Sequence, residues 1–277
     1  MKRLLFTALF CAAATLVFAQ TINKDSIKMA RDSAKQTRKK AKDFKFTLTA
    51  GDGTGANDTI TTKHRKDPTY PKFSAGIVVS RLDLGLATLI DNGSFTLSPQ
   101  NQFLRYRSWK SSNPGFDIVQ VAVRFSNNFR IYVSGGFDWE LIRLRDNITI
   151  LPNQPVLTYR QDNINYSKNR FSASYLRVPL SFDFRTNEDS KGKRAHFVIG
   201  PDAGFLLGGM VKQISSEFGK QKYNDNYHFT TFRYGMFTRV GYGGFGIFAK
   251  YYFNDLFENS PAQAGLKEFS FGLTLGF

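Results

Sequence analysis

Strict alternation of side-chain type in the last segment of the chain restricts its fold more than any other feature. From Phe269 to Phe277, every odd position is large and apolar, and every even position is Ser, Gly or Thr. The same period of two runs from Leu176 to Phe184 and from Phe232 to Tyr242, with charged residues between the apolar ones. A period of two is that of a β-strand with two different faces, so the chain is predicted to be all-β.

Segments of this kind predict eight strands. They lie at about residues 73–86, 116–126, 128–143, 171–186, 195–209, 229–242, 245–254 and 266–277. The connections at 126–128, 187–194 and 243–244 are short, whereas those at 87–115, 144–170, 210–228 and 255–265 are long and polar. Short turns at one end and long loops at the other are typical of transmembrane β-barrels, with the short turns on the periplasmic side.

Aromatic residues gather at the strand ends beside the short connections. The chain has 28 Phe and 12 Tyr. The predicted aromatic girdle consists of Phe73, Phe125, Phe129, Phe184, Phe197, Tyr242, Phe245 and Phe277. Such a ring is expected at a membrane interface. In lipid no sheet edge can stay unpaired, so the first strand is expected to meet the last. We therefore predict an eight-stranded antiparallel up-and-down transmembrane β-barrel over residues 73–277.

Charged residues between the apolar positions are then expected to point into the barrel lumen. The predicted set is Arg124, Asp138, Glu140, Arg177, Asp183, Arg185, Asp202, Arg233, Arg239 and Lys250. An eight-stranded barrel is just wide enough for side chains to fill it. We predict an ion-paired plug; the alternative is a path for protons or solutes, which would make the protein a channel or transport barrel.

The first nineteen residues have the pattern of a secretory signal peptide. Lys2 and Arg3 precede an apolar run over residues 4–18, and Ala19 supplies a small residue for cleavage. Cys11, the only cysteine, lies inside this segment, so the exported chain is predicted to carry no thiol and no disulfide.

Residues 20–72 are predicted to form a basic periplasmic extension and linker. If residues 24–42 are helical, one face carries a basic stripe. The stripe consists of Lys24, Lys28, Arg31, Lys35, Arg38 and Lys42. It could bind a partner or an anionic surface, or the segment could be a solvated, partly disordered tail. The formal net charge of +16 would suggest nucleic acid in a cytoplasmic protein. Export favours anionic lipid headgroups, lipopolysaccharide phosphates or an acidic envelope protein instead.

Motifs for catalysis or cofactors are weak. Residues 241–246 match G-x-G-x-x-G, but a strand follows where a nucleotide site needs a helix, so a tight turn is predicted. Asn and Asp clusters lack the spacing of a calcium site. His64, His196 and His228 are expected to be solvated; only His228, with Asp225 and Ser215 or Ser216, offers a grouping for a barrel enzyme. No catalytic, cofactor-binding or metal-binding residue is predicted.

The two longest loops, 87–115 and 144–170, carry exposed aromatics beside arginines. Tyr106, Trp109 and Tyr159 lie near Arg105, Arg107, Arg145 and Arg160 in sequence. This combination predicts either a binding surface or an outer rim that contacts lipopolysaccharide phosphates.

Three segments carry a resemblance to a known family. They are residues 175–184 (YLRVPLSFDF), 232–243 (FRYGMFTRVGYG) and 251–257 (YYFNDLF). Here the chain resembles the PorT-like outer-membrane β-barrel family, over roughly residues 73–277. The resemblance implies an outer-membrane location and an eight-stranded barrel, and some members assist type IX protein secretion. It brings no catalytic residues, and residues 21–72 lie outside it.

These observations predict a monomeric, non-enzymatic outer-membrane barrel. It would act as a structural or binding component of the cell envelope, or as an accessory of a type IX-like secretion system. A small-solute or ion channel and a barrel enzyme acting on lipid or peptide are the alternatives.

Overall fold

The structure is a computed structural model that describes residues 46–49, 70–78 and 81–277. The described residues belong to one compact unit, Lys45–Phe277. Its strands are β1 (Phe46–Thr49), β2 (Lys72–Val78), β3 (Leu82–Asp91), β4 (Ser112–Arg124), β5 (Phe129–Arg143), β6 (Ile148–Ile150), β7 (Tyr159–Gln161), β8 (Tyr166–Arg185), β9 (Ala195–Ser215), β10 (Gly219–Asp225), β11 (Phe232–Tyr242), β12 (Phe245–Tyr252) and β13 (Leu266–Leu275). Three short 3₁₀ helices, η2 (Pro99–Leu104), η3 (Ser108–Lys110) and η4 (Pro261–Gln263), lie in the long connections.

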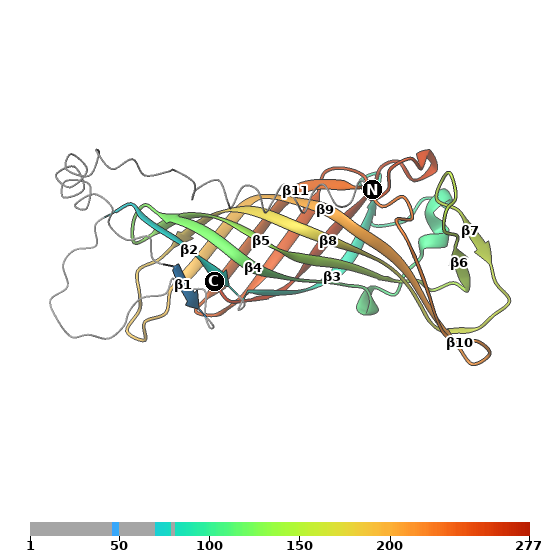
Figure 1. Ribbon diagram of the computed structural model, residues 1–277, viewed down its shortest axis with the longest axis horizontal. Coiled ribbons are helices and arrows are strands. Elements are labelled where there is room, and N and C mark those ends of the chain that lie inside the picture. Colours follow the sequence, from blue (N-terminus) through green and yellow to red (C-terminus); the bar gives the residue numbers. More distant parts are fainter. Residues whose placement is uncertain (1–45, 50–69, 79–80) are drawn as a thin grey trace, which may run out of the picture. The chain divides into compact units, whose positions relative to one another are not determined.

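Eight strands close into an antiparallel barrel (Figure 1). Neighbours run in the order β3, β4, β5, β8, β9, β11, β12 and β13, and β13 returns to β3 with Leu275 opposite Leu82. β2 and β3 pair with successive parts of β4, and β1 pairs with β2 in a parallel arrangement. The predicted eight-stranded antiparallel barrel is therefore confirmed.

Several strands extend further than the sequence pattern predicts. β8 begins at Tyr166 rather than near residue 171, and β9 continues to Ser215 rather than ending near residue 209. The predicted loop 210–228 is wrong, because β10 folds back on β9 through a turn at Gly219, whose φ is +62°. Residues 144–165 contain the β6–β7 hairpin. These additions lie beyond one end of the barrel in Figure 1, the end with the long connections.

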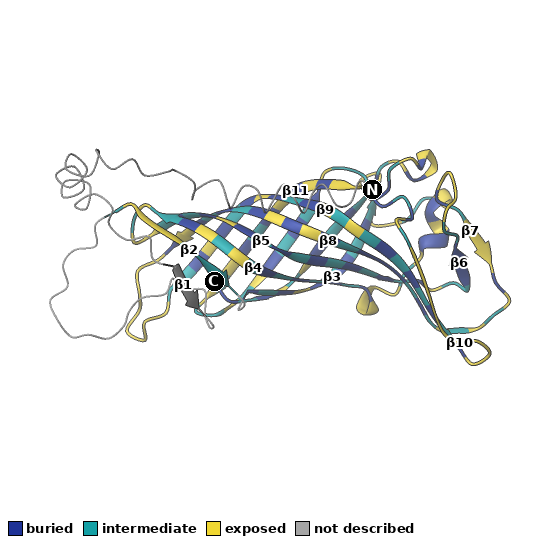
Figure 2. Cartoon of the chain, viewed as in Figure 1, coloured by how far each residue is buried: buried dark blue, intermediate teal, exposed yellow. Residues whose placement is uncertain are grey.

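The two faces of each barrel strand differ in burial, as the colours of Figure 2 show. On β5, Tyr132, Asp138 and Glu140 are buried, whereas Val133 is 43 % exposed. On β13, Glu268 and Ser270 are buried, whereas Leu273 is 61 % exposed. Apolar side chains thus face outward and polar ones inward, the reverse of a soluble protein and the arrangement of a membrane barrel. Among the described residues, no helix has the length and apolar character to cross a membrane.

The long connections pack into a hydrophobic cap over their end of the barrel. Leu104, Ile142, Ile148 and Ile150 share a buried cluster with Phe171, Tyr227, Phe229, Leu256 and Phe257. The Phe171 ring packs against the rings of Phe229 and Phe257, with centroid distances of 4.6 and 6.0 Å. Asn169 Nδ2 and Gln213 Nε2 donate to the carbonyl oxygen of Ile148, at 2.7 and 3.0 Å. The β6–β7 hairpin is therefore fixed to the inner face of β8 and β9.

Candidate functional site

The barrel interior holds a balanced set of charged side chains. Among the described residues, the buried acids of the barrel interior are Asp83, Asp117, Asp138, Glu140, Asp183, Asp202 and Glu268, and the buried bases are Arg81, Arg130, Arg177, Arg185, Arg233, Arg239 and Lys250. These are seven carboxylates and seven cations, so the formal charges of this set cancel. Two further buried acids, Asp91 and Asp162, bond to residues of the long connections. Buried charges are tolerated only when they are paired and hydrogen-bonded.

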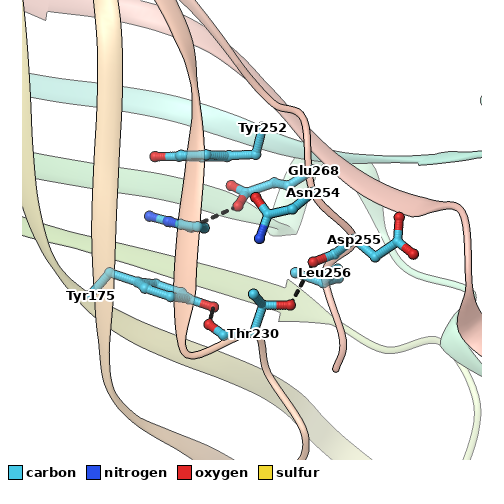
Figure 3. A pocket seen from close by; sticks show the side chains of 8 residues that line it. Tyr175, Thr230, Tyr252, Asn254, Asp255, Leu256 and Glu268 are labelled. Carbon is cyan, nitrogen blue, oxygen red and sulfur yellow. Dashed lines mark hydrogen bonds and ion pairs between the residues drawn. The ribbon is translucent and has the colours of Figure 1, made fainter. Parts of the chain in front are cut away.

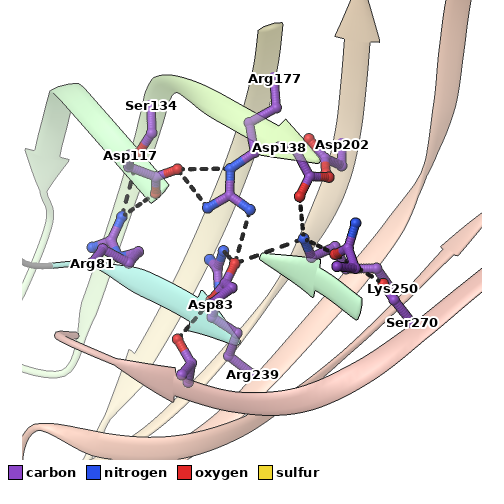
Figure 4. A network of polar contacts seen from close by, with 12 residues as sticks. Arg81, Asp83, Asp117, Ser134, Asp138, Arg177, Asp202, Arg239, Lys250 and Ser270 are labelled. Atoms are coloured by element: carbon purple, nitrogen blue, oxygen red, sulfur yellow. Dashed lines mark hydrogen bonds and ion pairs between the residues drawn. The ribbon is translucent and has the colours of Figure 1, made fainter. Parts of the chain in front are cut away.

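The middle of this network centres on Arg177 (Figure 4). Its guanidinium donates to Asp117 at 2.6 Å and to Asp83 at 2.8 Å. Arg81 reaches the second oxygen of Asp117 at 3.1 Å, and Arg239 reaches Asp83 at 2.9 Å. These groups come from β4, β8, β11 and the β3 region, so the ion pairs cross the lumen rather than run along one wall.

A second group, centred on Arg233, lies closer to the hydrophobic cap. Arg233 pairs with Asp138 at 2.6 Å and with Glu268 at 2.8 Å. Lys250 joins the two groups, because its Nζ lies 3.2 Å from Asp138 and 3.8 Å from Asp83. The hydroxyl of Tyr252 lies 3.2 Å from Asp138 Oδ2 and 3.1 Å from Asp202 Oδ2. The polar contacts are thus continuous along this part of the interior.

Asp183 is the shared partner of the buried basic groups at the end of the barrel beside the short turns. Arg130 donates to it at 2.8 Å, Arg185 lies 3.7 Å away, and the Nδ1 atom of His196 is 3.2 Å from its Oδ1. The His196 ring stacks on Phe277, with centroids 5.0 Å apart. The expectation of a solvated His196 is therefore wrong: it is buried because the alternation of β9 points it inward, onto Asp183.

One small pocket lies where the charged network meets the cap (Figure 3). Its walls include Tyr175, Arg233, Tyr252 and Glu268 from the strands, and Thr230 and Asp255 from the connections. Tyr175 donates to the Thr230 carbonyl at 3.2 Å, and the Thr230 hydroxyl donates to that of Asp255 at 2.6 Å. Arg233 and Glu268, both in this lining, form an ion pair of 2.8 Å, so part of the pocket wall is already engaged in polar contacts.

Nine of the ten residues predicted for the lumen are buried in it; Arg124 is only partly buried, at the end beside the short turns. The prediction did not include Arg81, Asp83, Asp117, Arg130 and Glu268. Asp83, Arg130 and Glu268 share the inward parity of their strands, so the alternation could have identified them. Asp117 lies next to a register shift in β4, where parity changes. Arg81 adjoins the undescribed residues 79–80.

Seven of the eight predicted girdle residues lie on the outer surface of the barrel. Phe73, Phe125, Phe184, Phe197, Tyr242 and Phe245 are exposed, and Phe129 is partly exposed between Phe125 and Phe184, with ring centroids at 5.9 and 5.0 Å. Phe277 is the exception and is 2 % exposed. The alternation ends at Gly276, whose φ of +77° turns the backbone and sends the Phe277 ring inward. Its inclusion in the girdle was wrong.

The remaining sequence features are placed as follows. His228, Asp225 and Ser215, the grouping considered for a barrel enzyme, each bond elsewhere. His228 Nε2 lies 2.8 Å from the Gln154 carbonyl oxygen, Asp225 accepts from the Asn153 amide, and Ser215 accepts from the Phe218 amide. The three side chains therefore do not form a catalytic arrangement. The described part of the chain has no group of three His, Cys, Asp or Glu side chains placed to hold a metal. The signal peptide, the basic stripe from Lys24 to Lys42, and His64 lie outside the described residues.

The comparison with protein families agrees with this architecture. The family model of the outer membrane protein beta-barrel domain matches residues 73–258 of the 277-residue chain. Among solved structures, the chain matches Ail, the attachment invasion locus protein of Yersinia pestis, which was crystallised with the heparin analogue sucrose octasulfate. The match has 14 % identity and a TM-score of 0.28, and covers 71 % of this chain and 96 % of Ail. No curated protein gives a match. The chain belongs to the outer membrane protein beta-barrel domain family.

Proposed function

We propose that the protein is a non-conducting, non-enzymatic barrel of the outer membrane that works as a structural or binding component of the envelope. The observation that supports this most is the cross-linked interior. Arg177, Arg233 and Lys250 connect carboxylates from opposite walls, with contacts of 2.6–3.2 Å. A solute would have to break several buried ion pairs to pass, and each break would leave buried charges unpaired.

The surfaces that remain for function are the two ends of the barrel. At one end, the hydrophobic cap holds the long connections in fixed positions, with Trp109 89 % exposed on η3. At the other end lie the short turns and Lys72, the first residue of β2. We propose that a monomeric barrel uses these two ends to contact other envelope molecules.

The finer role that we propose is that of a PorT-like accessory in a type IX-like protein secretion system. The segments 175–184, 232–243 and 251–257 support it, since they resemble that family. The basic stripe formed by Lys24, Lys28, Arg31, Lys35, Arg38 and Lys42 would then hold an acidic periplasmic partner. A signal peptide over residues 1–19 would deliver the chain to the envelope.

Affinity purification from detergent-solubilised envelopes tests this role. The full chain is compared with a variant in which the six stripe cations are replaced by Gln. A control, the turn variant, replaces with Gln the exposed lysines Lys191 and Lys193 of the β8–β9 turn and Lys110 of η3. We expect secretion components to copurify with the full chain and the turn variant, but not with the stripe variant. An unchanged set of partners in the stripe variant would contradict the role of the stripe.

A further inference from the structure

A row of cations crosses the outer surface of the sheet just above the lipid-facing band. Arg143 of β5 lies directly opposite Arg170 of β8, Arg170 opposite Lys212 of β9, and Lys212 opposite Lys222 of β10. Lys168 and Lys220 lie two positions further out, and both are opposite Ile214. Directly opposite residues have Cβ atoms about 5 Å apart. We call these six residues the basic row.

All six side chains lie on the same face of the sheet. Their neighbours in sequence, Ile142, Asn169, Val211 and Gln213, are buried against the cap, so the basic row faces away from it. The hydrogen bonds from Asn169 and Gln213 to Ile148 fix the inner side of this sheet. The row is therefore displayed on a rigid support rather than on a loose loop.

Nothing in the described part of the chain neutralises this row. None of the six has a carboxylate partner within ion-pair distance there, whereas the nearby Arg105 and Arg160 each have one. The charges that act most strongly on Lys212 are those of Lys168, Lys220, Arg170 and Lys222, all of the same sign. Like charges directly opposite each other destabilise a sheet. In addition, Nε of Arg170 is buried without a hydrogen-bond partner among the described residues.

The height of the row limits what can neutralise it. On the outward face, two residues from the row toward the lipid-facing band, Leu141 of β5 and Met210 of β9 lie on either side of Ser172. Trp139 lies two residues further along β5. On β9, Leu207 and Phe205 lie beyond Met210 in the same direction and are 57 and 47 % exposed. The step from the row to Leu141 is two residues, about 7 Å. In a membrane barrel whose long connections face the outside, the row would lie at the headgroup layer of the outer leaflet, and the residues below it would lie among acyl chains.

We propose that the basic row is a binding site for a phosphorylated glycolipid of the outer leaflet. Its phosphates would accept charge-assisted hydrogen bonds from Arg143, Arg170 and Lys212, and its acyl chains would lie on Leu141, Met210 and Leu207. The site needs a phosphate and an acyl chain on one molecule, because the cations and the apolar surface are adjacent. The proposed lipid site depends neither on the proposed secretion role nor on the closure of the lumen.

The test uses the full mature chain in nanodiscs of neutral phospholipid, titrated with bisphosphorylated lipid A and read by native mass spectrometry. The site variant replaces Arg170, Lys212 and Lys222 with Gln, and the matched control replaces with Gln three exposed lysines at the opposite end of the barrel, Lys72, Lys191 and Lys193. We expect the site variant, and dephosphorylated lipid A on the wild type, to bind roughly tenfold or more weakly. Equal binding in either case overturns the proposal, as does binding of soluble polyphosphate as tight as that of lipid A.

A stability measurement separates this role from a structural one. In neutral lipid without lipid A, removal of three repelling charges should leave the urea midpoint of the site variant equal to or above that of the wild type. Addition of lipid A should then raise the midpoint of the wild type and of the control, but not that of the site variant. A lower midpoint of the site variant in neutral lipid would mean that the row supports the fold, and would overturn the proposal.

Discussion

The guanidinium of Arg233 lies between the rings of Tyr175 and Tyr252, with its central carbon 3.6 and 4.1 Å from the two ring centroids. In this position it also pairs with Asp138 and Glu268. One side chain therefore connects β8, β12, β5 and β13 across the barrel. A cation between two aromatic faces gains from both, and more so away from water.

Arg233→Met should lower the free energy of unfolding by about 3–5 kcal/mol, because Asp138 and Glu268 would lose a buried partner. Urea unfolding in lipid vesicles, followed by tryptophan fluorescence, measures this loss. The matched control is Arg105→Met, whose ion pair with Asp146 is largely exposed; a change of at most about 1 kcal/mol is expected there. An equally small loss for Arg233→Met would contradict the structural role of this group.

Phe277→Ala should cost about 3–5 kcal/mol, because the ring fills the end of the barrel beside His196. A Cβ atom added at Gly241 or Gly246 would lie 2.3 or 2.5 Å from this ring, so the two strands are shaped around it. Phe218→Ala, in the exposed β9–β10 turn, is the control and should have little effect. The measurement is the temperature at which the barrel loses its compact mobility in SDS gels. Equal temperatures for the two variants would show that Phe277 does not fill the interior.

Gly200→Ala should prevent correct pairing of β8 and β9. A Cβ atom there would lie 1.8 Å from the carbonyl oxygen of Leu180, and backbone cannot yield as a flexible side chain can. Gly244→Ala is the matched control, since nothing lies within 4 Å of its added Cβ. The folded fraction after refolding into vesicles should fall sharply for Gly200→Ala alone. Normal folding of both variants would argue against the observed register of β8 and β9.

The β6–β7 hairpin should loosen in acid through Asp162. Burial raises the pKa of this carboxyl, but hydrogen bonds from Thr149, Arg160 and Tyr166 outweigh it and hold the pKa below its usual value. The unfolded chain titrates near about 3.9. The stabilisation is therefore fully present above that pH and is lost as the pH falls through the lower pKa of the folded state.

Hydrogen-exchange protection of residues 148–161, corrected for intrinsic rates, should thus fall between about pH 5 and about pH 2. Asp162→Asn cannot titrate, so its protection factors should be independent of pH over this range. Wild-type protection factors that stay constant over the same range would contradict the role of Asp162.

Much of the barrel follows from local sequence, because the alternation alone decides which face each side chain takes. Asp138, Arg177 and Arg239 could be assigned to the interior in this way. Which carboxylate each cation contacts could not be assigned, because the pairing of Arg239 with Asp83 joins positions 156 residues apart and depends on the register of the closed sheet. Asp83, Arg130 and Glu268 also have inward parity, so the alternation could have shown that the interior holds more acids than the four in the predicted set.

The features that the sequence pattern missed are those where the backbone departs from a regular strand. Gly276 reverses the direction of Phe277, and the register shift after Asp117 changes the parity of β4. The basic row was missed for a different reason. Arg143, Arg170 and Lys212 are far apart in sequence, and only the pairing of β5, β8 and β9 brings them into line.

Conductance of the purified protein in planar lipid bilayers tests the closed interior most directly. The ion pairs of Arg177 with Asp83 and Asp117, and of Arg233 with Asp138 and Glu268, should block the lumen. The account predicts no stable unitary conductance from the wild type, under conditions in which a porin conducts. Reproducible unitary steps from the wild type would contradict it.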